Sequence, residues 1–291
     1  MTKRFPTPDY HFSYRIPPVS GNTINGLGET SPRRARQGVY NAALVRLNNA
    51  GDYVLIVLLD VRYNAHPSAG HYLGDEQWAW LEALLLGDGL AAVLGPDATR
   101  VLTVVGSGTQ ILAMEKPLAE GWHHVPGERQ RLLDLLVAAG SPTLLFSGDI
   151  HMAEVIGPVH HCTDSAVGHF HDITTSGLTH SWGSAFWLKK SLIPIGLPAS
   201  NRLGGHAPIL RRNYAVLDLA IDGPGEPSVS VAIHDADSAE TLLSLTWSLA
   251  ELIPTPRTDA SVCDSPVPIF SLLRMVSGIQ AAGTVVYSLL G

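Results

Sequence analysis

The stretch Thr143-Leu-Leu-Phe-Ser-Gly-Asp-Ile-His151 indicates the kind of fold to expect. It begins with an apolar run and then stops at small and acidic residues. Two earlier runs have the same form: Val54-Leu-Ile-Val-Leu-Leu59 stops at Asp60, and Val101-Leu-Thr-Val-Val105 stops at Gly106-Ser-Gly108. Continuous apolar runs of this length are typical of strands that are buried on both faces. We therefore expect the three runs to be central strands of one sheet.

Two amphipathic segments lie between these runs. Glu76–Leu86, with Asp75 as its expected N-cap, places Trp78, Leu81 and Leu85 on one face. Glu128–Ala139 has a similar apolar face and is followed by Gly140, a residue that commonly ends helices. This alternation of strands and helices predicts a parallel α/β sheet, whose chemistry gathers beyond the carboxyl ends of the strands. The candidate positions there are Asp60, Ser107, Asp149 and His151.

The second half of the chain has a different pattern. Phe170–Thr175 is expected to be a further strand, and Ala215–Ile221 and Val229–His234 alternate with a period of two. Their connection through Asp222-Gly-Pro-Gly-Glu-Pro227 predicts a hairpin with one solvated face. A mixed sheet or a second sheet should therefore follow the parallel unit.

The composition narrows the class of protein. In 291 residues, Lys and Arg number 19 and Asp and Glu number 26, so the net charge is −7, and charged residues make up 15% of the chain. Typical soluble domains have roughly 25%. This composition excludes a disordered tail, a coiled coil and a collagen-like fibre, and it argues against a nucleic-acid partner, which goes with a basic surplus. With a mean hydropathy of +0.15, much apolar surface must be hidden in a core, against a partner or in a membrane.

Several segments bear on domain organisation and compartment. Residues 1–37 are expected to be irregular, and the N-terminus has no apolar core of a signal peptide. Residues 253–268 are rich in Pro, Ser, Thr and Asp and are interpreted as a linker. The apolar tail 269–291 is expected to be a helix, either a membrane anchor or a covering or interfacial helix.

Cys162 and Cys263 are too few for a disulfide framework or a zinc cluster. One disulfide between them and two free thiols stay open as alternatives.

The sharpest motif is Ser147-Gly-Asp-Ile-His151. In an extended segment residues i and i+2 point the same way, so Asp149 and His151 are expected to aim an oxygen and a nitrogen at one place. A carboxylate beside an imidazole suits Zn, Fe or Mn. The alternative is an Asp that caps a turn and a His that fills a gap in the packing.

Gly168-His-Phe-His171 contains a pair of histidines at the same spacing, which we interpret as a chance pair with a packing or surface role.

Two further motifs follow strands. Asp60-Val-Arg62 puts an acid and an arginine at a strand end, where Arg62 can hold a phosphate through two parallel hydrogen bonds. The alternative is a structural salt bridge. Gly106-Ser-Gly-Thr109 is rich in glycine but lacks the lysine of a P-loop and the third glycine of a dinucleotide fingerprint. It is not the Gly-x-Ser-x-Gly elbow of serine hydrolases either.

Read in order, segments within residues 38–235 resemble the PhoD-like alkaline phosphatase family of the calcineurin-like metallophosphoesterases. The matching pieces are Gly38-Val-Tyr40, Leu58-Leu-Asp-Val-Arg-Tyr63, Leu73-Gly-Asp-Glu-Gln-Trp-Ala-Trp-Leu-Glu82, Glu120-Gly-Trp122 with Pro126-Gly-Glu-Arg129, Ser147-Gly-Asp-Ile-His151, Thr175-Ser-Gly-Leu-Thr-His180 and Asn213–Ile221. The resemblance implies an incomplete four-layer α/β/β/α metallophosphoesterase-like sandwich. Residues 38–252 would be the C-terminal portion of the family domain.

The same resemblance implies an activity, the hydrolysis of phosphate mono- or diesters. Two metal ions, drawn from Fe, Mn, Zn and Ca, would polarise the phosphoryl group and generate a hydroxide for in-line attack. Asp149 and His151 align with the last metal-binding motif of the family. The candidate site residues are Asp60 and Arg62 for catalysis, Asp149 and His151 for metal, and Ser176 and His180 for substrate.

The earlier ligand motifs of the family are not found in this sequence: an N-terminal Asp, a Gly-Asp-x-x-Tyr segment, and an Asp-Asp-His or Asn-His segment. Two ligands cannot hold a binuclear centre, because catalytic metals usually need three protein ligands. A non-catalytic pseudophosphatase and a membrane-associated interaction protein therefore stay open as alternatives. A membrane-associated or secretory location is the expectation, with membrane contact through residues 269–291.

Overall fold

A computed structural model describes residues 37–47, 52–87, 99–116, 119–184, 199–204, 207–221 and 225–264. Its helices are α1 (Asp75–Leu86) and α3 (Pro126–Ala139), with short 3-10 turns η2 (Pro67–Ala69), η3 (Trp122–His124), η4 (Trp182–Ser184) and η5 (Ala250–Leu252). Its strands are β1 (Asn41–Arg46), β2 (Tyr53–Leu58), β3 (Arg100–Gly106), β4 (Thr143–Ser147), β5 (Ala153–Cys162), β6 (Ala166–Thr175), β7 (Arg202–Leu203), β8 (Asn213–Ala220), β9 (Ser228–Asp235), β10 (Thr241–Ser248) and β11 (Thr255–Pro256).

The main sheet has the strand order β1-β2-β3-β4-β6-β5-β7, and β11 pairs with β6. The three apolar runs of the sequence lie side by side and parallel, as predicted: Leu55 pairs with Thr103, and Val104 pairs with Leu144. Strand β6 continues the parallel set next to β4. Strands β1, β5 and β7 are antiparallel to their neighbours. The sheet is therefore mixed at both edges around a parallel centre.

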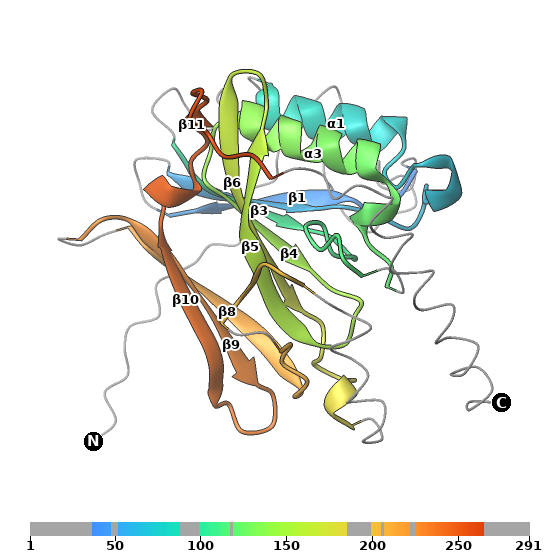
Figure 1. The fold of residues 1–291 in the computed structure, drawn as a ribbon, viewed down its shortest axis with the longest axis vertical. Coiled ribbons are helices and arrows are strands. Elements are labelled where there is room, and N and C mark those ends of the chain that lie inside the picture. Colours follow the sequence, from blue (N-terminus) through green and yellow to red (C-terminus); the bar gives the residue numbers. More distant parts are fainter. Residues whose placement is uncertain are drawn as a thin grey trace.

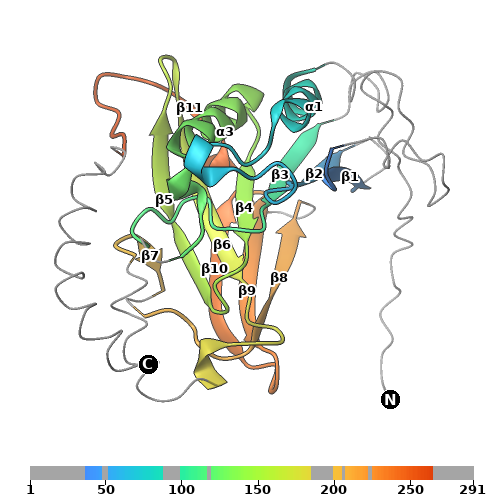
Figure 2. The same cartoon turned by 90° about the vertical axis from the view of Figure 1, so that its right-hand side faces the viewer.

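Both faces of this sheet are covered (Figure 1). Helices α1 and α3 pack on one face, and a three-stranded sheet of order β10-β9-β8 packs on the other (Figure 2). In β2, Leu55 and Val57 belong to the core under the helices, whereas Val54 belongs to the core between the sheets. Burial on both sides is why these strands are continuously apolar. The described residues thus supply three layers, α/β/β, of the expected four-layer sandwich.

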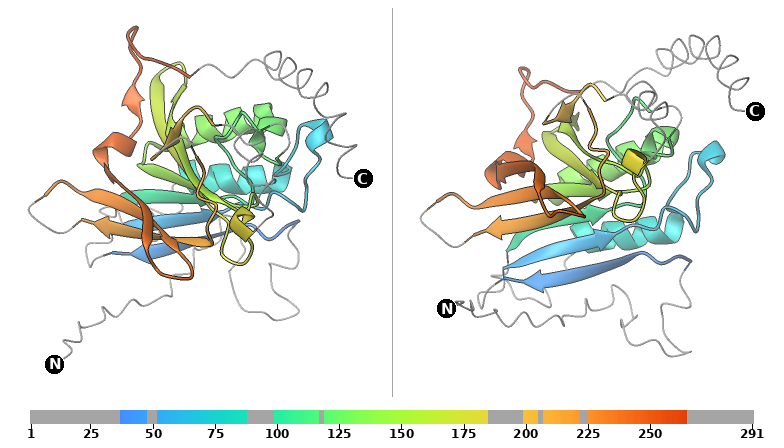
Figure 3. Two further views of the ribbon diagram at one scale, coloured as in Figure 1. Left: turned by 60° about the horizontal axis from the view of Figure 1, so that its bottom comes forward. Right: turned by 90° about the horizontal axis from the view of Figure 1, so that it is seen from below.

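The predicted hairpin is confirmed as β8–β9, which pair in antiparallel register and are joined by β10 on the other side of β9 (Figure 3). Every second residue of β9 is buried, including Val229, Val231 and Ile233. These three side chains lie in the core between the two sheets. The period of two in the sequence therefore reflects one face on the main sheet and one face outward.

The helix boundaries differ slightly from the expected ones. Helix α1 begins at Asp75 itself, and its N-cap is Gly74, whose φ of 75° is in the left-handed region. The prediction of Asp75 as N-cap is therefore wrong. Glycine occupies the N-cap position because it alone takes this conformation without strain. Helix α3 begins earlier, at Pro126, since proline suits the first turn of a helix. Its predicted end is confirmed by Gly140, with φ 67°.

Cys162 and Cys263 form a disulfide, which resolves the two alternatives left open by the sequence. Ahead of it, β11 pairs with the start of β6, and the backbone N–H of Arg257 donates to the carbonyl of Ser165 at 2.9 Å. The described part of the predicted linker, residues 253–264, is therefore attached to β6 of the main sheet.

The predicted tail helix 269–291 and the irregular residues 1–36 lie outside the described residues. No helix in the described part of the chain is long and apolar enough to cross a membrane. The division into an irregular segment, a domain, a linker and a tail otherwise stays a prediction.

Candidate functional site

Arg62, just beyond the carboxyl end of β2, is the centre of a charged cluster. Its guanidinium is ion-paired with Glu120, and a second nitrogen lies 3.4 Å from Oδ1 of Asp149, which follows β4. The three side chains are 59%, 57% and 37% exposed, in that order, so the cluster faces solvent. The hydrogen bond that Arg62 donates to Glu120, together with the charges of Glu120 and Asp149, raises the pKa of Arg62, which therefore stays charged. Arg62 therefore takes part in structural ion pairs and is also a cation that a ligand can reach from solvent.

Asp60 holds the turn that presents Arg62. Its Oδ1 accepts hydrogen bonds from the backbone N–H groups of Arg62 and Tyr63, both at 2.9 Å, and its Oδ2 accepts one from Val39 at 2.7 Å. Burial by itself raises the pKa of Asp60, but these three amides outweigh it and lower the pKa below its usual value. Asp60, predicted as catalytic, therefore acts on the site through the backbone of the turn.

The segment 148–151 after β4 is a tight turn rather than an extended strand. Asp149 has φ 78° and His151 has φ 54°, both left-handed. The expectation that these side chains point the same way through an extended backbone is therefore wrong. Asp and His tolerate this region better than most residues, yet it costs free energy, and such strain gathers at functional sites.

His151 and His180 are brought to the same surface, with ring centroids 6.3 Å apart and both side chains exposed. Trp182 lies beside them, its ring centroid 6.4 Å from that of His151. The indole N–H of Trp182 donates to the carbonyl of Ile150 at 2.7 Å and thereby anchors the turn. The structure therefore places a metal candidate and a substrate candidate next to each other.

Two other candidates have structural partners. The hydroxyl of Ser176, a predicted substrate residue, donates to the carbonyl of Met152 at 3.2 Å and joins the end of β6 to the turn after β4. Ser107 is buried, and its Oγ accepts from the indole of Trp122 at 3.0 Å and from the N–H of Thr109 at 3.3 Å. The glycine-rich segment after β3 is thus closed by its own hydrogen bonds.

The pair in Gly168-His-Phe-His171 does not converge on one point. Nδ1 of His169 lies 3.0 Å from Nδ1 of His160 across the β5–β6 pair. His171 is buried, and its Nε2 accepts from the indole N–H of Trp247 at 3.1 Å. Burial lowers the pKa of His171 to about 4, so it packs as a neutral ring.

The residues present do not fit a binuclear metal centre. Asp149 faces the guanidinium of Arg62, and His151 lies beside His180 and Trp182. Across the residues that the structure describes, no group of three or more His, Cys, Asp or Glu side chains is placed to hold a metal ion. A catalytic metal needs about three protein ligands. The predicted ligands Asp149 and His151 therefore form no centre by themselves.

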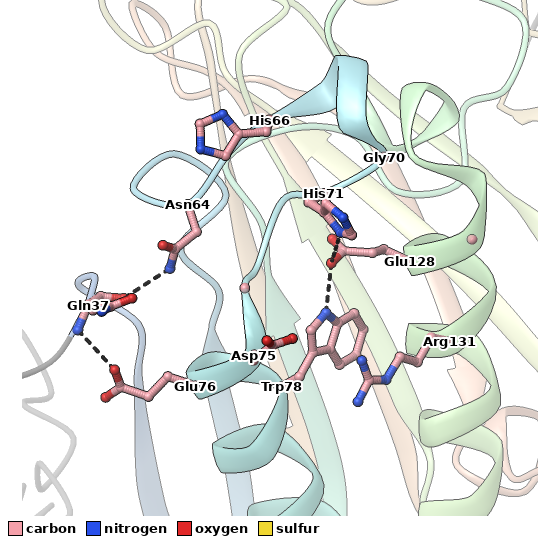
Figure 4. Close-up of a pocket in the computed structure, with 12 residues that line it drawn as sticks. Gln37, Asn64, His66, Gly70, His71, Asp75, Glu76, Trp78, Glu128 and Arg131 are labelled. Atoms are coloured by element: carbon pink, nitrogen blue, oxygen red, sulfur yellow. Dashed lines mark hydrogen bonds and ion pairs between the residues drawn. The ribbon is translucent and has the colours of Figure 1, made fainter.

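A separate cavity of about 630 Å³ lies where the first turns of α1 and α3 meet (Figure 4). At its wall, buried Glu128 accepts the indole N–H of Trp78 at 2.8 Å and lies 3.7 Å from Nδ1 of exposed His71. Its second oxygen accepts the backbone N–H of Tyr72 at 2.6 Å. None of the residues predicted for the site lines this cavity.

Two contributors to the Arg62 cluster were not predicted as site residues. Glu120 pairs with Arg62, and Tyr72 donates its hydroxyl to the carbonyl of Gly121 at 3.0 Å, which holds the Glu120 backbone in place. Burial, and then the charge of Glu120, raises the pKa of Tyr72, which keeps the phenol protonated as a donor. The segment Glu120-Gly-Trp122 stood among the family-like pieces, so a sequence signal existed for Glu120 but gave it no role.

No protein-family model matches the chain, and no curated protein matches it in sequence. Among solved structures, that of PhoD matches 84% of this chain and 50% of its own, with a TM-score of 0.46 and 11% identity. Purple acid phosphatase PPD1 from yellow lupin (Lupinus luteus) seeds matches 76% of this chain and 36% of its own, with a TM-score of 0.38 and 12% identity. The chain spans half or less of the length of these two structures. Both TM-scores are below 0.5, so these matches assign neither family nor activity to the chain.

Proposed function

We propose that this chain is the phosphate-binding part of a PhoD-like phosphoesterase and takes phosphate mono- or diesters at the Arg62 cluster. One observation carries the proposal: an exposed guanidinium is fixed by Glu120 and Asp149 where β2 and β4 end. Ligands of open α/β sheets bind beyond the carboxyl ends of the strands. A guanidinium matches a phosphate through two parallel, charge-assisted hydrogen bonds.

The charge balance of the cluster determines how a phosphate can bind. Glu120 and Asp149 together carry two negative charges against the single positive charge of Arg62. A dianionic phosphate must therefore displace Glu120 from the guanidinium or arrive with a cation. Glu120 is the one to move, since its side chain is 57% exposed and that of Asp149 is 37% exposed.

Hydrolysis is a separate question from binding in this proposal. Asp149 and His151 make no metal centre among the described residues, so the proposal gives them no metal-dependent step. The chain's own residues hold and orient the ester: Asp60 fixes the turn, Arg62 holds the phosphate, and His180 lines the adjoining surface. Substrate class and hydrolysis rest on the sequence resemblance and are tested below.

The test is calorimetric titration of the chain with p-nitrophenyl phosphate and with inorganic phosphate, with and without Mn²⁺ or Ca²⁺. We expect Arg62→Ala to weaken binding at least tenfold. The matched control is Arg131→Ala, which removes an arginine of similar exposure that is paired with Glu82. Equal affinity in Arg62→Ala and the unaltered chain overturns the proposal. Release of p-nitrophenol, lost in Asp149→Ala and His151→Ala, separates an enzyme from a non-catalytic binding domain.

A further inference from the structure

His160 and His169 form a pair of imidazoles that the Arg62 cluster does not use. They lie directly opposite each other in the antiparallel β5–β6 pair. Side chains of directly opposed residues project from the same face. Their Nδ1 atoms are 3.0 Å apart, and the two rings meet at an interplanar angle of 79°. The two Nδ1 atoms, one from each of two neighbouring strands, are therefore held close together on one face of the sheet.

The pair lies in the wall of a small cavity. The cavity has a volume of about 340 Å³ and is closed on the other side by β11 and the segment that follows it, including Thr258 and Ser261. Nε2 of His169 is 3.0 Å from the hydroxyl of Thr255 in β11. The backbone N–H of His160 donates to Asp264, which lies next to the disulfide-bonded Cys263. Both strands and the closing segment are thus fixed around the two rings.

We propose that His160 and His169 chelate a divalent transition-metal ion of the Cu²⁺ or Ni²⁺ type through their Nδ1 atoms. Metal–imidazole bonds are about 2.1 Å long, so two ligands at a right angle lie about 3.0 Å apart, and two tetrahedral ligands about 3.4 Å. The observed 3.0 Å fits adjacent positions of a square or tetragonal site, which Cu²⁺ and Ni²⁺ prefer.

The contact with Thr255 supports this role for His169. A metal-bound imidazole almost always donates its other ring N–H to an oxygen, which fixes the tautomer that leaves the ligating nitrogen unprotonated. The hydroxyl of Thr255 at Nε2 provides that acceptor. Without an ion, the two Nδ1 atoms form one hydrogen bond, in which one nitrogen donates and the other accepts.

The remaining ligands of the ion are water molecules. Within the described ranges no third His, Cys, Asp or Glu is positioned to complete a metal site. The cavity has room for water, and its wall carries the hydroxyls of Thr255, Thr258 and Ser261. The site is therefore an open two-histidine chelate, distinct from the predicted ligands Asp149 and His151 after β4.

The experiment titrates the full chain with CuCl₂ and reads electron paramagnetic resonance and calorimetry. We expect one ion with two nitrogen ligands, at least tenfold weaker binding in H160Q or H169Q, and loss of that ion in the double variant. The control H66Q/H71Q removes another pair of opposed histidines, at an isolated bridge, and should leave the affinity unchanged. Equal stoichiometry and affinity in the unaltered chain and H160Q/H169Q overturn the proposal.

A second measurement needs no variant. In the unaltered chain, substoichiometric Cu²⁺ should broaden the imidazole NMR signals of His160 and His169 before those of any other histidine. Earlier broadening of other histidine signals also overturns the proposal, whether or not the variants fold.

Discussion

Lys116 pairs with Glu154 inside the protein, where only 1% of the lysine side chain and none of the glutamate side chain is exposed. Arg202 contacts the other carboxylate oxygen, with its Nε 2.7 Å from Oε2. A single negative charge is therefore shared by two cations in a buried site. Burial, followed by the charge of Arg202, lowers the pKa of Lys116 to about 7.

This arrangement predicts that stability rises with pH in the alkaline range. An unfolded lysine titrates near 10.5 and the folded Lys116 near 7, so between these values the unfolded chain holds the extra proton. Raising the pH through this window therefore favours the folded state, with a slope approaching about 1.4 kcal/mol per pH unit. Urea unfolding at steps between pH 7 and 10 measures it.

Two variants separate this effect from other titrations. Lys116→Met removes the proton and leaves Glu154 neutralised by Arg202, so the slope should disappear at a small cost in stability. Glu154→Gln removes the carboxylate that Lys116 and Arg202 both contact and should cost about 3–5 kcal/mol. A slope that persists in Lys116→Met contradicts the assignment.

Glu128 is the second buried carboxylate whose removal should be costly. It accepts hydrogen bonds from the indole of Trp78 and from the backbone N–H groups of Tyr72 and Leu73. Glu128→Ala leaves these buried donors without an acceptor, and we expect a loss of about 3 kcal/mol in the free energy of unfolding. Glu82→Ala, which removes an exposed ion pair with Arg131, should cost less than about 1 kcal/mol. Similar losses in both variants would argue against a special role of Glu128.

Asp60→Asn tests the turn that presents Arg62. The substitution puts an amide where carboxylate oxygens accept three backbone N–H groups, and we expect a loss of about 2 kcal/mol. Because the folded pKa of Asp60 is lowered, its contribution is present above the unfolded value of 3.8 and lost as the pH falls through the folded value. The acid unfolding of Asp60→Asn should therefore begin from a less stable protein and depend less on pH in that range. Unfolding monitored between pH 2 and 5 decides this.

The central strands and the hairpin could be predicted because burial imposes a periodicity that the residues themselves show. Val54 and Leu55 face different cores, which requires an unbroken apolar run, and β9 alternates because only one of its faces is covered. Gly140 could be predicted as a helix end because its left-handed φ is a local property.

The details of the site could not be predicted from local patterns. The left-handed conformations of Asp149 and His151 depart from the extended backbone on which the expected directions of their side chains depended. The role of Asp60 depends in part on the amide of Val39, which lies 21 residues away in the sequence and reaches Asp60 only in the folded chain. The disulfide depends on the attachment of β11 to β6, a contact between segments far apart in the sequence.

The Cys162–Cys263 disulfide should contribute strongly to stability, because it closes a loop with a sequence separation of 101. Loop-closure entropy for a loop of that size corresponds to about 4–5 kcal/mol, so Cys162→Ser/Cys263→Ser should lower the free energy of unfolding by several kcal/mol. Dithiothreitol should lower the melting temperature of the unaltered chain and leave that of the double variant unchanged.

Since disulfides persist in oxidising compartments, thiol labelling of protein from cells lysed with a blocking agent should find both cysteines unreactive. Labelling of both thiols under these conditions would place the protein in a reducing compartment.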